Sequence, residues 1–226
     1  MSKPVCAVIG IGPKNGKAFA TRFAEEGYAV ALLSRSTDYS KGLAAELGGR
    51  AYACDVTDPA AIKQAFAQVR EDLGDVEVLL YNAGSGQFGT FDDVPDEAFE
   101  KGWQINVRGL LQSSREVLGP MREKGSGAII ITGATASLRG KPFTAAFAQA
   151  KAAQRSLAQS FARQLGPEGI HVALVIVDGG IGTDEQSDDE GALRPSDIAS
   201  TVYHLATQPK SAWTFEVDVR PFKENW

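Results

Sequence analysis

The chain has 226 residues, of which 43% are hydrophobic and 23% are charged, the proportions of an ordinary soluble globular domain. Its formal net charge of −5 argues against nucleic acid or an anionic membrane as the main partner. Two distant cysteines, Cys6 and Cys54, form no CxxC or His/Cys cluster, and no signal peptide or membrane span is recognisable at the start. We therefore expect no metal site, no disulfide and no membrane contact, and a cytoplasmic location.

Short apolar runs alternate with longer amphipathic runs, the pattern of βαβ units. Strands are expected over 5–10, 28–34, 50–54, 76–81, 127–133, 171–177 and 213–219. Helices are expected over 16–27, 41–49, from Asp58-Pro59, over 95–123, over 143–165 and from Pro195. Parallel strands need crossovers, so we predict one Rossmann-type α/β domain over 1–226: a doubly wound parallel sheet of about seven strands with helices on both faces.

The first predicted strand is followed directly by a glycine-rich turn, Gly10-Ile11-Gly12-Pro13-Lys14-Asn15-Gly16. Glycines after a strand and before a helix let backbone N–H groups approach a pyrophosphate. A turn that merely needs positive φ is the alternative. In its βαβ context the turn favours a dinucleotide site.

The end of the second predicted strand carries Ser34 and Arg35, where a site for NAD would need an acidic residue for the ribose 2′-hydroxyl. A small residue beside a guanidinium suits a 2′-phosphate. An ordinary surface arginine is the alternative. The pattern favours NADP(H) over NAD(H).

An acidic stretch without apolar periodicity spans about 183–195 and contains Asp184, Glu185, Asp188, Asp189 and Glu190. It is expected either to be a solvated loop or to be a short substrate loop over the strand ends. In the second case its charge would discourage anionic substrates such as acyl-CoA.

Several motifs in order resemble those of the short-chain dehydrogenase/reductase family, over nearly the whole chain. They are the glycine turn, with Lys14 at the family's middle glycine; Asp55 in CDV; Asn82-Ala83-Gly84; Asn106 in INVRG; Lys151; and Asp178-Gly179 before Thr183, with Asp for the usual Pro. The resemblance implies a cofactor site made of Gly10, Gly12, Pro13, Lys14, Asn15, Gly16, Ser34, Arg35, Asp55, Val56, Asn82, Ala83, Gly84, Lys151, Gly179, Ile181 and Thr183.

The resemblance also implies an unusual catalytic set. The family's acid is a tyrosine four residues before the lysine, and that position is Phe147 here; the usual serine falls on Ala134. Asn106 and Lys151 remain, the first to hold a water and the second to bind the nicotinamide ribose. Loss of a positioned general acid costs roughly 10²–10⁴-fold in rate.

Three functions stay open. The chain is an NADP(H)-dependent oxidoreductase whose proton donor is displaced to Ser137, Thr135, Tyr81 or a water between Asn106 and Lys151; Ser137 is the residue that we include in the catalytic set. Alternatively, its small substrate is an activated C=C or C=N compound that needs little proton assistance. In the third case it binds NADP(H) without turnover, as a sensor or an assembly subunit.

Other features receive plainer interpretations. His171 and His204 are expected to be structural or surface residues. The C-terminal stretch 218–226 is expected near the mouth of the site or in an oligomer contact. A stripe of mostly small residues on the helix over 143–165 (Ala145, Ala148, Ala152, Gln159) would allow close helix packing, and with the family resemblance it predicts a homodimer or homotetramer.

Overall fold

The computed structural model describes residues 3–186 and 191–224. Within them a seven-stranded sheet has the order β3-β2-β1-β4-β5-β6-β7, and every neighbouring pair is parallel. The strands are β1 (Val5–Ile9), β2 (Ala29–Ser34), β3 (Arg50–Ala53), β4 (Val76–Tyr81), β5 (Gly127–Ala134), β6 (Ile170–Val177) and β7 (Glu216–Val219). The predicted doubly wound parallel sheet is confirmed.

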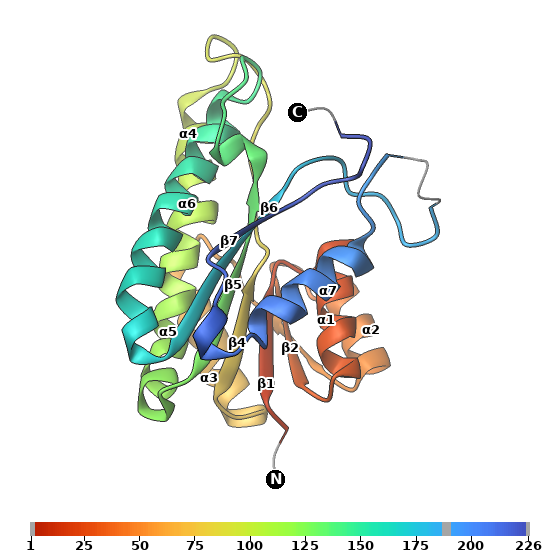
Figure 1. Cartoon of the computed structure of the whole chain (residues 1–226), viewed down its shortest axis with the longest axis vertical. Coiled ribbons are helices and arrows are strands. Elements are labelled where there is room, and N and C mark those ends of the chain that lie inside the picture. Colours follow the sequence, from red (N-terminus) through yellow and green to blue (C-terminus); the bar gives the residue numbers. More distant parts are fainter. Residues whose placement is uncertain (1–2, 187–190, 225–226) are drawn as a thin grey trace.

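Helices cover both faces of this sheet (Figure 1). α3 (Pro59–Asp72), α5 (Gly109–Lys124) and α6 (Ala145–Leu165) pack on one face. α1 (Asn15–Glu25), α2 (Asp38–Leu47) and α7 (Pro195–Ala206) pack on the other. The core therefore lies in two layers, and the buried strands are apolar on both sides because both faces are covered.

The predicted helix over 95–123 is not one regular α-helix. It consists of α4 (Asp96–Trp103), the π-helical turn η1 (Gln104–Arg108) and α5 in direct succession. Within η1 the side-chain amide of Asn106 donates to the carbonyl of Gly102 at 2.8 Å, so a side chain takes up a helix carbonyl. The wider turn is thus centred on a predicted site residue.

The last strand is shorter than predicted. The stretch 213–219 was expected to be extended throughout, but the strand begins at Glu216, after the 3₁₀ turn η5 (Lys210–Ala212). Trp213 instead stacks on His171, with ring centroids 4.8 Å apart. The indole is used for packing before the strand begins.

The two histidines behave as predicted. His171 is buried in β6, and its ring nitrogens lie 3.0 Å and 2.9 Å from the carbonyl oxygens of Leu205 and Thr214. His204 is exposed near the end of α7. In the described part of the chain, no helix is both long enough and apolar enough to cross a membrane.

The strand order changes direction between β1 and β4, because the chain runs outward from β1 to β3 and then returns to continue from β4. The connections after these two neighbouring strands leave toward opposite faces of the sheet. A crevice forms at the carboxyl ends of strands at such a point, and this is where open α/β sheets bind ligands.

Candidate functional site

A cavity of about 360 Å³ lies at this point of the sheet. It is bordered by the glycine turn, the end of β2, the segment after β3 and the segment after β4. The predicted cofactor residues on its lining are Gly10, Gly12, Ser34, Arg35, Asp55, Val56, Asn82, Ala83 and Gly84. The fold therefore brings nine of the predicted residues, from four separate segments, around one cavity.

A Cβ would meet different surroundings at each of the three glycines of the first turn. Gly10 has φ +94°, and a Cβ there would lie 2.5 Å from the backbone nitrogen of Ala83. A Cβ on Gly16 would lie 2.6 Å from the carbonyl oxygen of Gly10. Gly12 has no described protein atom within 4 Å of such a Cβ, so protein packing does not require a glycine there. The open space beside Gly12 is what close approach of a ligand needs.

Asn15 begins α1 directly after this turn and is 6% exposed. Its side-chain oxygen is buried and has no hydrogen-bond partner among the described residues. A buried polar atom without a partner costs free energy unless a water or ligand satisfies it. This orphaned oxygen at the turn fits a bound polar group.

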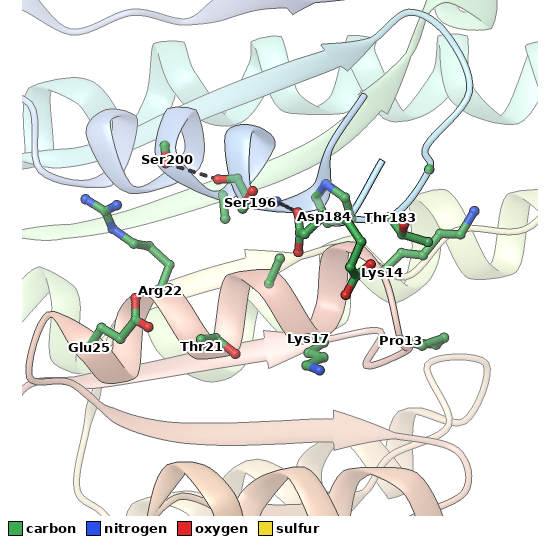
Figure 2. A pocket seen from close by; sticks show the side chains of 15 residues that line it. Pro13, Lys14, Lys17, Thr21, Arg22, Glu25, Thr183, Asp184, Ser196 and Ser200 are labelled. Carbon is green, nitrogen blue, oxygen red and sulfur yellow. Dashed lines mark hydrogen bonds between the residues drawn. The ribbon is translucent and has the colours of Figure 1, made fainter. Parts of the chain in front are cut away.

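The rest of the turn faces a second cavity, of about 450 Å³, between α1 and α7. Pro13, Lys14 and Thr183 line it, and Figure 2 shows Lys17, Thr21 and Arg22 along α1 opposite Ser196 and Ser200 on α7. The ammonium of Lys14 donates to the carbonyl of Ile181. Lys14 thus links the glycine turn to the loop that follows β6.

At the end of β2, Ser34 and Arg35 have different roles. The Ser34 hydroxyl donates to the carbonyl of Ser36 at 2.7 Å and lies 3.0 Å from the Ser40 hydroxyl. The exposed guanidinium of Arg35 makes no hydrogen bond or ion pair with any described residue, yet it borders the 360 Å³ cavity. Arg35 is therefore the group at this strand end that remains free to bind an anion.

Asp55 lies across this cavity from the glycine turn. Its carboxylate accepts hydrogen bonds from the backbone nitrogen and the hydroxyl of Thr57, at 2.9 Å and 2.8 Å. Chiefly the backbone hydrogen bond, and to a smaller degree the charges of Arg35 and Lys101, lower the pKa of Asp55. The carboxylate is thus ionised and held in place, with two cations nearby.

Lys151 is 5% exposed, so its side chain does not extend to solvent. Its ammonium donates to the carbonyl of Thr132 at 2.9 Å and to the side-chain oxygen of Gln154 at 3.0 Å. Burial lowers its pKa from 10.5 to about 8. The amide of Gln154 donates in turn to the backbone carbonyl of Asn106, at 3.0 Å.

The Lys151 ammonium and the Asn106 side-chain oxygen both lie close to Gly84. A Cβ on Gly84 would lie 3.3 Å from the Lys151 nitrogen and 3.4 Å from the Asn106 side-chain oxygen. The Asn106 amide nitrogen donates to the carbonyl of Ser85, at 2.7 Å, as well as to Gly102. Its oxygen is buried and has no described partner. A cation and an unsatisfied acceptor thus lie on the same side of Gly84.

Phe147 lies one helical turn before Lys151, and its ring centroid is 6.0 Å from the ammonium. The ring packs against Gly86 and against Phe88, whose centroid is 5.4 Å away. It borders a third cavity, of about 160 Å³, which also includes Thr135 and Asp178. Phe147 therefore lies near the Lys151 ammonium and also borders a cavity lined by aromatic and charged side chains.

Of the candidate proton donors, Tyr81 is placed elsewhere. It is fully buried, its hydroxyl donates to the carbonyl of Ile105, and burial raises its pKa. The Tyr81 hydroxyl is used in the core, and this alternative is wrong. The Thr135 hydroxyl borders the Phe147 cavity and lies 3.4 Å from the carbonyl of Val177, a weak hydrogen bond. Ser137 is not on that lining, and its buried hydroxyl has no described partner.

The loop after β6 contributes Thr183 to the lining of the 450 Å³ cavity. Gly179 has φ +131°, and a Cβ there would lie 2.8 Å from Pro221, so the C-terminal segment packs on this loop. Ile181 and Leu193 form an isolated parallel β-bridge. Asp184 caps α7 by accepting from the backbone nitrogen of Ser196 at 2.9 Å. The other predicted acidic residues, Asp188, Asp189 and Glu190, lie outside the described residues.

Comparison with known proteins identifies this arrangement. A family model described as short chain dehydrogenase matches residues 5–191. The chain belongs to the short-chain dehydrogenase family. The 3-oxoacyl-(acyl-carrier-protein) reductase MabA of Mycobacterium bovis is 31% identical, over 87% of this chain and 82% of that protein.

Solved structures agree in fold with this short-chain dehydrogenase. A short-chain dehydrogenase from Rhodopseudomonas palustris is 35% identical, with a TM-score of 0.85 over 97% of this chain and 99% of that one. The alcohol dehydrogenase of the archaeon Thermococcus sibiricus, in complex with 5-hydroxy-NADP, is 25% identical, with a TM-score of 0.89 over 99% of both chains. The present chain is accordingly an NAD(P)-dependent oxidoreductase.

The residues present fit a nicotinamide cofactor. The open side of Gly12 and the orphaned oxygen of Asn15 are at the carboxyl end of β1, and the orphaned oxygen of Asn106 lies near Gly84, beyond the carboxyl end of β4. The orphaned oxygens are acceptors and suit the hydroxyl donors of a ribose, whereas the open backbone at Gly12 suits the close approach of a pyrophosphate.

The sequence motifs did not indicate every site residue of this short-chain dehydrogenase. Lys101 on α4 borders the 360 Å³ cavity, and nothing in its sequence neighbourhood indicates this. Gln154 could have been predicted as a site residue, because a polar residue three positions after Lys151 lies on the same helix face. Phe88, Arg139 and Lys141 border the Phe147 cavity but come from segments without a motif, whereas Glu224 lies in the C-terminal stretch that is expected near the mouth of the site.

Proposed function

We propose that this chain is an NADP(H)-dependent oxidoreductase that acts on a small carbonyl, alcohol or activated C=C or C=N compound, through a site in which Phe147 and Ala134 stand where the family has its tyrosine and serine. The observation that carries the proposal is that the Lys151 ammonium and the unpartnered Asn106 oxygen both lie close to Gly84. Bound NADP(H) supplies or accepts the hydride.

The preference for NADP(H) rests on Arg35. Its guanidinium borders the cavity without a hydrogen bond or ion pair to any described residue, and Ser34 beside it leaves room. A guanidinium offers a fork of donors to a phosphate. No carboxylate occupies the end of β2, where one would bind a ribose 2′-hydroxyl.

The proton route uses Lys151 and a water. Two of the three N–H groups of the ammonium are used by Thr132 and Gln154, and the third is free to donate toward the space shared with Asn106. A pKa of about 8 suits a general acid, because the best acid titrates near the working pH. In reduction, Lys151 releases this proton through a water held by the Asn106 oxygen to the substrate oxygen.

Cofactor binding tests the first part of this proposal. NADPH is expected to bind about tenfold or more tightly than NADH, and Arg35→Ala should remove most of that difference while leaving NADH affinity unchanged. Arg115→Ala, an exposed arginine on α5, is the control. Equal affinities in the wild type would contradict the NADP(H) preference.

Turnover tests the second part. NADPH consumption is measured with small aldehydes, ketones, enals and imines, and Lys151→Met should abolish it. Tight NADPH binding with no consumption across the panel would favour the alternative function, a cofactor-binding sensor or subunit.

We also propose a homo-oligomer that uses the small residues of α6. Ala152 is exposed there, and Ala145 is partly exposed, so a second helix could approach the backbone closely. Light scattering measures the mass; Ala152→Glu should reduce it to that of one chain.

A further inference from the structure

We propose that the 160 Å³ cavity beside Phe147 binds the single aromatic ring of an uncharged substrate, so that the preferred substrates are aryl aldehydes, aryl ketones or the corresponding alcohols. This proposal rests on the proposed function, because it names the substrate class of the same site. It follows from the walls of the cavity, its size, the balance of its charges and its place beside Lys151.

Three of the described phenylalanines, Phe88, Phe143 and Phe147, border the cavity. Phe88 and Phe147 have centroids 5.4 Å apart with their planes inclined by 40°. Phe88 is 62% exposed and Phe143 is 52% exposed. Large apolar side chains gathered at a concave site and left in water are characteristic of a binding surface. A bound ring would cover them and gain the favourable tilted contacts of aromatic pairs.

The size of the cavity fits one ring. An apolar cavity of about 150 Å³ accommodates benzene. At about 160 Å³, the cavity beside Phe147, which is open to solvent, has room for a phenyl group. Short straight-chain substituents would fill the cavity poorly and would contact less of the rings of Phe88, Phe143 and Phe147.

The charges around the cavity balance. Arg139 and Lys141 border it, and so do Asp178 and Glu224. Asp178, with a side chain 8% exposed, lies 3.7 Å from Arg139 and 3.4 Å from Arg220, so its carboxylate is already paired. Two cations and two anions give no net preference for an ionised substrate, which leaves the apolar walls to decide.

The cavity beside Phe147 lies close to Lys151. Phe147 borders the cavity, and its ring lies 6.0 Å from the Lys151 ammonium. Thr135 adds a hydroxyl to the same lining. A ring held against Phe147 therefore has its substituent close to the groups that bind the cofactor and move the proton. Phe147 acquires a positive role here, as a wall of the substrate site.

Binding of unreactive amides tests the ring site without turnover. Benzamide and isobutyramide are titrated into the NADPH-loaded and cofactor-free protein and followed by NMR chemical shifts. Benzamide is expected to bind about tenfold more tightly. Phe88→Ala should remove most of that difference. Phe91→Ala is the matched control, because Phe91 is 76% exposed in the same segment but does not border the cavity.

Three outcomes would overturn the ring site: equal affinity for the two amides, equal effects of Phe88→Ala and Phe91→Ala, or tighter binding of benzoate than of benzamide. A turnover comparison separates this failure from that of the proposed function. Consumption of NADPH with butanal as efficient as with benzaldehyde would leave the oxidoreductase intact and refute the ring site. Benzamide binding that depends on Phe88, without NADPH consumption, would support the ring site and refute the oxidoreductase.

Discussion

The side chain of Gln154 connects the two polar residues of the site: its oxygen accepts from the Lys151 ammonium at 3.0 Å, and its amide donates to the Asn106 backbone carbonyl at 3.0 Å. Gln154 is fully buried, so no water competes for these hydrogen bonds. The link holds the cation against the π-helical turn that carries Asn106. Both the position and the protonation of Lys151 therefore depend on an uncharged neighbour.

Gln154→Leu keeps the volume and removes the acceptor. The cationic form of Lys151 loses a hydrogen bond, so its pKa should fall further below about 8, whereas Gln154→Glu should raise it. The measurement is the dissociation constant of NADPH from pH 6 to 9, whose midpoint should move down in the first variant and up in the second. Gln159→Leu, on the same helix, is the control. A common midpoint in all four proteins would contradict this role.

Burial of the Lys151 ammonium should also lower the free energy of unfolding, by an amount that depends on pH. Its folded pKa of about 8 lies below the ordinary 10.5, so between these values the unfolded chain binds the extra proton. Raising the pH through this window therefore removes the cost and stabilises the fold. Between pH 7.5 and 9.5 the wild type should gain about 2 kcal/mol relative to Lys151→Met. Urea unfolding of both proteins at the two pH values measures this; parallel pH dependence would contradict it.

Gly12→Ala separates binding from folding. The added methyl meets no described protein atom within 4 Å, so the free energy of unfolding should stay within about 0.5 kcal/mol of the wild type. The methyl would fill the space in which we place the cofactor, and NADPH affinity should fall about tenfold or more. Gly119→Ala, equally open but on α5, is the control and should leave affinity unchanged. Undiminished NADPH affinity in Gly12→Ala would mean that the cofactor does not approach this glycine.

Phe147→Tyr adds a hydroxyl to a ring that already lies 6.0 Å from the Lys151 ammonium. A phenol one turn before a cation is a better-placed acid than a water, so NADPH consumption with a small aldehyde should rise roughly 10²-fold. The dissociation constant of NADPH should not change. Phe143→Tyr, in the same cavity, is the control. No gain in Phe147→Tyr, in a protein that still turns over, would mean that proton transfer does not limit the rate.

Most of the fold could be predicted because its strands are buried on both faces. GAIIITG and HVALVIV are continuous apolar runs, and only covered parallel strands tolerate them. The π-helical turn at Asn106 could not be predicted, since it changes the register of a helix without changing its apolar pattern. Trp213 has a typical strand residue type, and only the position of His171 decides that it stacks instead.

Some parts of the site could likewise be predicted from the sequence, and others could not. The glycine turn, Arg35 and Lys151 are each recognisable from a few neighbouring residues. The Phe147 cavity is not, because its walls come from positions as far apart as Phe88 and Glu224. Tyr81 is a prediction that was wrong. The sequence shows that its hydroxyl is near a strand end, but not that the hydroxyl donates to the Ile105 carbonyl in the core.

His171 provides a test of the fold away from the site. Both ring nitrogens face carbonyl oxygens, of Leu205 and Thr214, although a neutral imidazole has one N–H to donate. Burial outweighs these carbonyls and keeps the pKa below 6.5. As the pH falls through 6.5 the unfolded chain takes up a proton that the folded chain does not. The fold should therefore lose stability, by up to about 1.4 kcal/mol per pH unit, until the folded pKa is reached.

Urea unfolding between pH 7.5 and 5 measures this loss. In His171→Leu the loss attributable to this residue should disappear, whatever the variant's absolute stability, because the slope and not the level reports the titration. His204→Leu removes an exposed histidine and should keep the wild-type slope. A wild-type slope that persists in His171→Leu would mean that the pKa of His171 is the same in the folded and the unfolded chain, and would contradict the lowering by burial.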